Sequence, residues 1–98
     1  MTNGENQALS VANKFLPDIT EEQMIKKLGE EIIELAIAIE RKDEINIREE
    51  IGDCAYILLH ILSKHDKNNE GIVNRIVCAS EKLATRMSSG YYDNKKHL

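Results

Sequence analysis

Two pairs of acidic residues have a spacing that could form a metal site. Glu31 and Glu34 are three residues apart, as are Glu50 and Asp53, and residues at this spacing are neighbours on one face of a helix. Mg²⁺ and Mn²⁺ prefer carboxylate oxygens, and Mg²⁺ completes its shell with water and substrate phosphates. The residue types therefore predict a divalent-metal site if the two pairs meet. Solvated acidic helix faces are the alternative interpretation.

The two pairs lie on either side of a polar stretch at residues 41–43, where the apolar pattern pauses. If the chain turns there, Glu34 and Glu50 stand about eight residues from the turn, or ~12 Å along each helix axis. Glu31 and Asp53 come level about eleven residues from it. An antiparallel helix hairpin would gather four carboxylates at one depth, and such a cluster repels itself unless a cation lies between them.

Local sequence signals provide the helices that such a hairpin needs. Thr20 and Gln23 form a capping box at a helix start, Pro17 ends an earlier short helix, and Gly90 is a helix-stop signal. Apolar residues that recur at spacings of three and four predict helices at about residues 9–16, 20–41, 46–65 and 72–90. The predicted fold class is all-α, a four-helix bundle with the acidic site on an antiparallel hairpin.

Composition supports one folded helical domain. The chain has 98 residues, 42% of them apolar and 31% charged, which is too apolar for general disorder and too short for two cores. We predict a single domain over 1–98, with an N-terminal helix and linker at 1–19, core helices at 20–90 and a loose tail at 91–98. The net charge of −4 and the few aromatic residues argue against nucleic acid as a partner.

The chain shows no pattern typical of membranes or secretion. Its first residues lack a basic start followed by an apolar block, and its longest nearly apolar run, 54–62, is far short of the ~18–20 residues that span a bilayer. We therefore expect no membrane contact and a cytoplasmic location.

The third predicted helix has more apolar surface than a lone small bundle can cover. Its apolar residues lie around most of the girth of the helix, at Ile51, Ile57, Leu58, Leu59, Ile61 and Leu62. Large apolar patches are unusual on the surface of a monomer. The sequence therefore predicts a homo-oligomer.

Two glycines and two histidines near the acidic pairs have structural interpretations. Gly29 and Gly52 are costly inside helices, so we expect either a group that approaches the backbone closely or tight helix packing there. His60 is interpreted as a packed histidine, and His65 as a cation at a helix C-terminus.

The stretch KLGEEIIELAIAIERKDEINIREEIGDCAYILLHIL resembles the MazG-type all-α nucleoside triphosphate pyrophosphohydrolases. Their signature is E-E-x-x-E followed by E-x-x-D; Glu30, Glu31 and Glu34 match the first block, and Glu50 and Asp53 match the second. The resemblance covers about residues 20–65 well and the last helix loosely. It implies Mg²⁺-dependent cleavage of a nucleoside triphosphate to the monophosphate and pyrophosphate, in a homodimer or dimer of dimers that clears aberrant nucleotides or adjusts nucleotide pools.

The same resemblance implies roles for the five acidic residues. Glu31, Glu34, Glu50 and Asp53 correspond to the ligands of Mg²⁺, or of Mn²⁺ in its place. Glu30 corresponds to an additional acidic residue next to them. All five make up the catalytic set that the family signature predicts, and the residue that takes the proton of the attacking water stays open.

The family also brings basic side chains from its last helix to the phosphates. Lys82 and Arg86 are the match in this chain, and Lys27 is a further candidate for substrate binding; solvated cations are the alternative for each. The family often continues with an aromatic residue and proline, whereas this chain has SSGYYDN. Tyr91 or Tyr92 could stack on a base or belong to a frayed tail.

Two other functions fit the same signature. Phosphoribosyl-ATP pyrophosphatases share it, although GDCAYILLH departs from their A-D-L-x-Y-H. A non-catalytic helical assembly or nucleotide-sensing domain could also retain the acids. The preferred base and sugar stay open; we expect their pocket on the first and last helices and a neighbouring subunit, with Asn13, Lys14, Phe15 and Leu16 as candidates from the first helix.

Overall fold

The computed structural model describes residues 1–90, which form four α-helices and no strand. The predicted all-α fold is confirmed. The predicted tail with Tyr91 and Tyr92 lies outside the described residues. The helices in chain order are α1 (Asn3–Phe15), α2 (Glu21–Glu40), α3 (Glu44–Ser63) and α4 (Ile72–Ser88).

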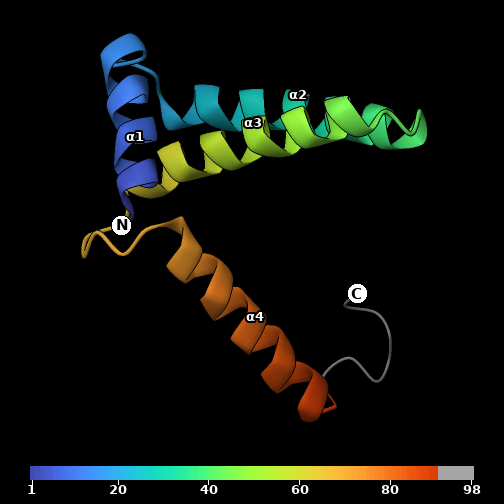
Figure 1. The fold of residues 1–98 in the computed structure, drawn as a ribbon. Coiled ribbons are helices and arrows are strands. Elements are labelled where there is room, and N and C mark those ends of the chain that lie inside the picture. The colour runs from blue at the N-terminus through green and yellow to red at the C-terminus, as the bar shows by residue number, and fades with distance from the viewer. Residues whose placement is uncertain (91–98) are drawn as a thin grey trace.

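α2 and α3 form an antiparallel hairpin, which Figure 1 shows as two long helices lying side by side. At the end of α2, Lys42 adopts a left-handed conformation with φ 57°. The Lys42 N–H donates to the Ile39 carbonyl, and the Asp43 N–H donates to the Ala38 carbonyl. These bonds make a Schellman motif, which ends the helix and reverses the chain. The Asp43 side chain then caps the start of α3 by accepting from the Asn46 N–H.

The N-termini of α1 and α2 are fixed by side-chain caps. Thr20 and Gln23 form the predicted capping box at the start of α2. α1 begins at Asn3, well before Leu9, because Thr2 accepts a hydrogen bond from the Glu5 N–H. Its first turn is polar, so the apolar pattern alone did not show where this helix starts.

α1 lies across the end of the hairpin that is far from the turn (Figure 1). Leu9 and Ala12 of α1 are buried there together with Met24 of α2 and Leu59 of α3. The Tyr56 hydroxyl donates to the Ala8 carbonyl of α1 at 2.9 Å. Three helices therefore converge at this end, and α1 covers the interior of the hairpin there.

α4 extends away from the other three helices (Figure 1). It is attached through its N-terminus, where the buried Glu5 carboxylate of α1 accepts from the Ile72 N–H at 3.1 Å. Asp66 organises the preceding loop by accepting from the Glu70 and Gly71 N–H groups, and these bonds lower the pKa of its carboxyl, with the Gly71 bond as the largest cause. None of the residues of α4 is buried.

No helix within residues 1–90 has the length and apolar character needed to cross a lipid bilayer.

Gly71→Ala is expected to lower the free energy of unfolding by about 1–3 kcal/mol, the cost of a backbone conformation that essentially only glycine adopts. Gly71 has φ 91° and ψ 172°, and an added Cβ would also press on the Glu5 carboxylate that caps α4. Urea unfolding followed by circular dichroism measures the change. Gly4→Ala is the matched control: Gly4 is helical and has room for a Cβ, so the control should keep or gain stability. Equal stability of Gly71→Ala and wild type would contradict this account of the loop.

Candidate metal centre

The hairpin brings together acidic residues that are far apart in the sequence. Glu31 of α2 and Glu50 and Asp53 of α3 each place one carboxylate oxygen within 4.8 Å of the others. Glu31 is buried, Glu50 is half-buried and Asp53 is exposed. We call these three residues the acidic cluster. It is open on the Asp53 side and closed on the Glu31 side.

The carboxylates of the acidic cluster strongly affect each other's ionisation. The pKa of Glu50 is raised to about 7, first because its protonated carboxyl can hydrogen-bond to Glu31, then through burial and the neighbouring negative charges. The pKa of Glu31 is lowered, first by the same interaction with Glu50 and then by Lys27, whose Nζ lies 3.1 Å from Glu31 Oε1. Close like charges explain the opposite shifts, because two adjacent carboxylates cannot both ionise freely.

The cluster fits a hard divalent cation. Oε2 of Glu31 and Oε2 of Glu50 are buried and have no hydrogen-bond partner among the described residues. A buried polar atom without a partner is unfavourable, and an oxygen-only donor set from three carboxylates matches the preference of Mg²⁺ and Mn²⁺. A cation would satisfy both oxygens and offset the repulsion between the carboxylates.

Two residues of the family signature lie outside the acidic cluster. Glu34 is exposed and shares a cavity of about 200 Å³ with Glu50; it is close enough for its charge to contribute to the raised pKa of Glu50. Glu30 is also exposed. The pKa of Lys27 is raised mainly by its hydrogen bond to Glu31 and by the charge of Glu31, and the charge of Glu30 makes a smaller contribution. Both therefore lie around the cluster and do not join its three-oxygen core.

Gly29 and Gly52 make no close contacts within residues 1–90 that would require a glycine. A Cβ added at either glycine would meet no atom of another helix or of a side chain within 4 Å. Tight packing between the described helices therefore does not account for them. Open space lies above each glycine, next to the acidic residues.

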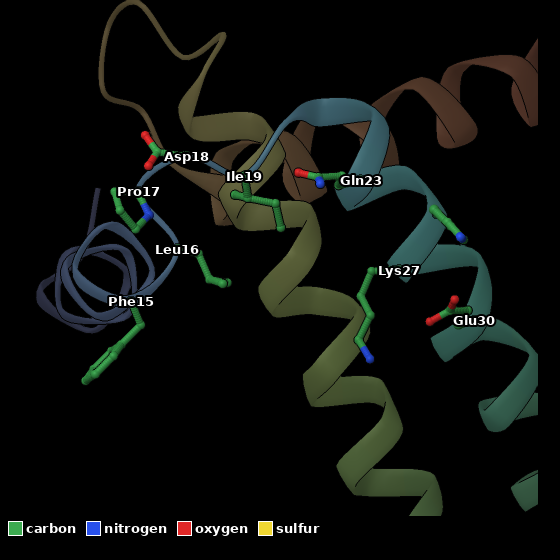
Figure 2. Close-up of a pocket in the computed structure, with 9 residues that line it drawn as sticks. Phe15, Leu16, Pro17, Asp18, Ile19, Gln23, Lys27 and Glu30 are labelled. Atoms are coloured by element: carbon green, nitrogen blue, oxygen red, sulfur yellow. The ribbon is translucent and has the colours of Figure 1, made fainter.

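Lys27 stands between two cavities. The outer cavity, of about 700 Å³, lies along the α1–α2 connection and includes Leu16, Ile19 and Glu30 in its lining. Figure 2 shows Lys27 and Glu30 on α2 beside this connection, with Phe15 pointing away from α2 and α3. Of the residues expected at a base pocket, Phe15 and Leu16 line the outer cavity.

The inner cavity, of about 340 Å³, lies between α1, α2 and α3 and borders the acidic cluster. Its lining includes Lys27, Glu31 and Asp53 at the cluster, and His60 from the next turns of α3. His60 is buried, as predicted, but its Nε2 has no hydrogen-bond partner among the described residues. His60 is seven residues after Asp53, so helical spacing alone already places the two residues on the same face of α3.

The predicted phosphate-binding residues of the last helix lie elsewhere. Lys82 and Arg86 are in the second half of α4, which points away from the hairpin (Figure 1). The structure therefore does not bring them to the acidic cluster of the same chain. His65, interpreted as a helix-end cation, lies just after the end of α3 and also pairs with Glu21, with 2.5 Å between Nε2 and Oε1.

Comparison with known proteins identifies the family to which these features belong. The sequence profile of a family described as the MazG nucleotide pyrophosphohydrolase domain matches residues 19–89. Searches of curated proteins and of solved structures returned no match. The matched segment contains both helices of the hairpin, the acidic cluster, Glu30, Glu34 and all of α4. Together with the all-α fold, this match shows that the chain belongs to the MazG nucleotide pyrophosphohydrolase domain family.

Proposed function

We propose that this protein is a Mg²⁺-dependent nucleoside triphosphate pyrophosphohydrolase that releases a nucleoside monophosphate and pyrophosphate. The observation that carries the proposal is the acidic cluster, in which two helices bring three carboxylates together and leave two buried oxygens unpaired. Membership of the family supports the reaction class. The position of the cut, between the α- and β-phosphates, is taken from the family resemblance.

Glu31, Glu50 and Asp53 would hold the cation, with Glu34 as a further ligand in line with the family signature and Glu30 as an additional acidic residue. A divalent cation held there supplies positive charge that binds phosphate oxygens and makes a nearby water acidic enough to attack phosphorus at neutral pH. Mg²⁺ is the proposed ion and Mn²⁺ a substitute, since both favour oxygen ligands.

The side chains around the cluster support binding of a polyphosphate. The Lys27 side chain lies beside Glu31 and lines both the outer and the inner cavity. Its ammonium group can therefore bind a phosphate in either cavity. A triphosphate offers more oxygens to Lys27 and to a cation than a monophosphate does. We therefore propose nucleoside triphosphates as the substrates, within cytoplasmic nucleotide pools that the enzyme adjusts or clears of aberrant nucleotides.

We further propose that the active form is a homodimer or a dimer of dimers. Exposed apolar residues repeat every seven positions on both helices of the hairpin. They are Ile25, Ile32 and Ile39 on α2, and Ile51 and Leu58 on α3. Apolar residues at this spacing form the contact seam of packed helices. A second copy would cover these residues and could bring its own Lys82 and Arg86 to the phosphates.

A substrate panel tests the activity. Purified protein is incubated with the common ribo- and deoxyribonucleoside triphosphates and with phosphoribosyl-ATP, each with Mg²⁺ or with EDTA. Pyrophosphate is measured by a coupled assay, and nucleotide binding is measured separately by calorimetry. We expect release from at least one triphosphate with Mg²⁺ and none with EDTA. Nucleotide binding without turnover would favour a nucleotide-sensing domain, and turnover of phosphoribosyl-ATP alone would favour the related pyrophosphatase.

A further inference from the structure

We propose that the inner cavity binds the base and sugar of the nucleotide, and that Nε2 of His60 hydrogen-bonds to the polar edge of the base. His60 would then determine which bases the enzyme prefers. The inference rests on the proposed function, because the acidic cluster must hold the phosphates for the base to enter this cavity.

The inner cavity has chemically different ends. Lys27, Glu31 and Asp53 line it at the acidic cluster, where charged phosphates and their cation would bind. His60 lies seven residues beyond Asp53 on the same face of α3, about 10 Å along the helix axis. A nucleotide has the same order of groups, with charged phosphates at one end and an uncharged heterocycle at the other.

His60 has an unpaired polar atom and lines the inner cavity at the end away from the acidic cluster. The residue is only 4% exposed, and its Nε2 has no hydrogen-bond partner among the described residues. Buried polar groups in native proteins are nearly always paired with protein, water or ligand. Burial, followed by the charge of Lys64, lowers the pKa of the His60 imidazole. This favours the neutral ring, which is the form that matches the uncharged edge of a base.

The remaining walls suit a flat apolar ring. Met24 of α2 and Ile57 of α3 line the cavity with aliphatic surface, and Leu16 closes it from the α1 side. The Tyr56 hydroxyl already donates to the Ala8 carbonyl, which fixes the aromatic ring against α1. The volume of about 340 Å³ falls within the range of small-molecule sites, which combine apolar walls with a few placed polar groups.

Nuclear magnetic resonance on the unmodified protein tests the location of the base. Isotope-labelled protein is titrated with AMP, GMP, CMP and UMP, each with and without Mg²⁺, while the ring resonances of the histidines are followed. We expect at least one monophosphate to shift the His60 Nε2 resonance. The exposed His65, which pairs with Glu21 outside the cavity, serves as the internal reference and should not shift.

Kinetics of matched variants test the role of His60 in base preference. In His60→Leu, the ratio of kcat/KM between the best and the poorest triphosphate is expected to fall about tenfold, the effect of losing one buried hydrogen bond. His60→Gln, which retains a polar group at similar reach, should recover part of the preference. His65→Leu makes the same chemical change outside the cavity and should leave the ratio unchanged.

The outcomes separate this inference from the proposed activity. A shift of His60 by a monophosphate without turnover of any triphosphate would refute the activity and support the cavity as a nucleotide site. Turnover with no His60 shift, and with an unchanged base ranking in His60→Leu, would overturn the inference and leave the activity intact. If His60→Leu does not fold, the titration of the unmodified protein decides alone.

Discussion

The Asp53→Asn variant is expected to release pyrophosphate at least about 100-fold more slowly than the wild type, because weakened metal coordination costs activity on this scale. Asp53 is the exposed member of the acidic cluster, so its replacement leaves the packing of the hairpin unchanged. The loss of one negative charge also reduces repulsion within the cluster, so the thermal stability measured without Mg²⁺ should stay equal or rise. Glu34→Gln has the same expected direction, since the family signature places Glu34 among the ligands.

Glu49→Gln is the matched control for Asp53→Asn. Glu49 is an exposed carboxylate on α3, adjacent to Glu50 in sequence but outside the acidic cluster, so this variant should retain activity and cation binding. Mn²⁺ binding, followed by electron paramagnetic resonance, should weaken in Asp53→Asn and remain intact in Glu49→Gln. Wild-type turnover of Asp53→Asn at low Mg²⁺ would show that the cluster is not the metal site.

Ile76→Glu is expected to reduce the particle mass of the protein in solution. We expect the wild type at micromolar concentration to have at least twice the chain mass of 11.1 kDa. Ile76 is 60% exposed and belongs to an apolar stripe of α4 with Val73, Val77, Leu83 and Met87, all exposed on the isolated chain. We propose that a second copy covers this stripe as well as the exposed apolar residues of α2 and α3. A glutamate in the stripe would then have to bury its charge, which is costly.

Thr85→Glu tests the same helix outside the apolar stripe. Thr85 is exposed on α4. A helix with 3.6 residues per turn places Thr85 more than about 100° around the helix axis from the centre of the apolar stripe. This control should keep the wild-type mass in light scattering. A wild-type particle of 11.1 kDa, or equal masses of Ile76→Glu and wild type, would contradict the role of α4 in association.

Residue counting along the hairpin predicted part of the acidic site. The turn at residues 41–43 lies where the pause in the pattern placed it, and Glu31 lies level with Asp53. Counting along an axis ignores rotation about that axis. Met24, Glu31 and Ala38 are seven residues apart and all buried, so Glu31 belongs to the row that faces the interior. Glu34 is three residues further on, about 60° off that row, and is therefore exposed.

Features that depend on long-range contacts could not be obtained from local patterns. The cap that Glu5 of α1 provides for α4 joins residues 67 positions apart, and no spacing rule connects them. His60 shares its helix face with Asp53, but only the position of α1 makes that face a cavity. The apolar stripe of α4 was predicted from its periodicity, whereas its direction away from the hairpin depends on the loop at Asp66 and Gly71.

Identification of the products by ³¹P nuclear magnetic resonance tests the proposed reaction most directly. The wild-type protein is incubated with Mg²⁺ and its best triphosphate, and the spectrum is followed to completion, with Asp53→Asn as the inactive control. The account predicts a nucleoside monophosphate and pyrophosphate in equal amounts. A nucleoside diphosphate with orthophosphate as the inorganic product would contradict it.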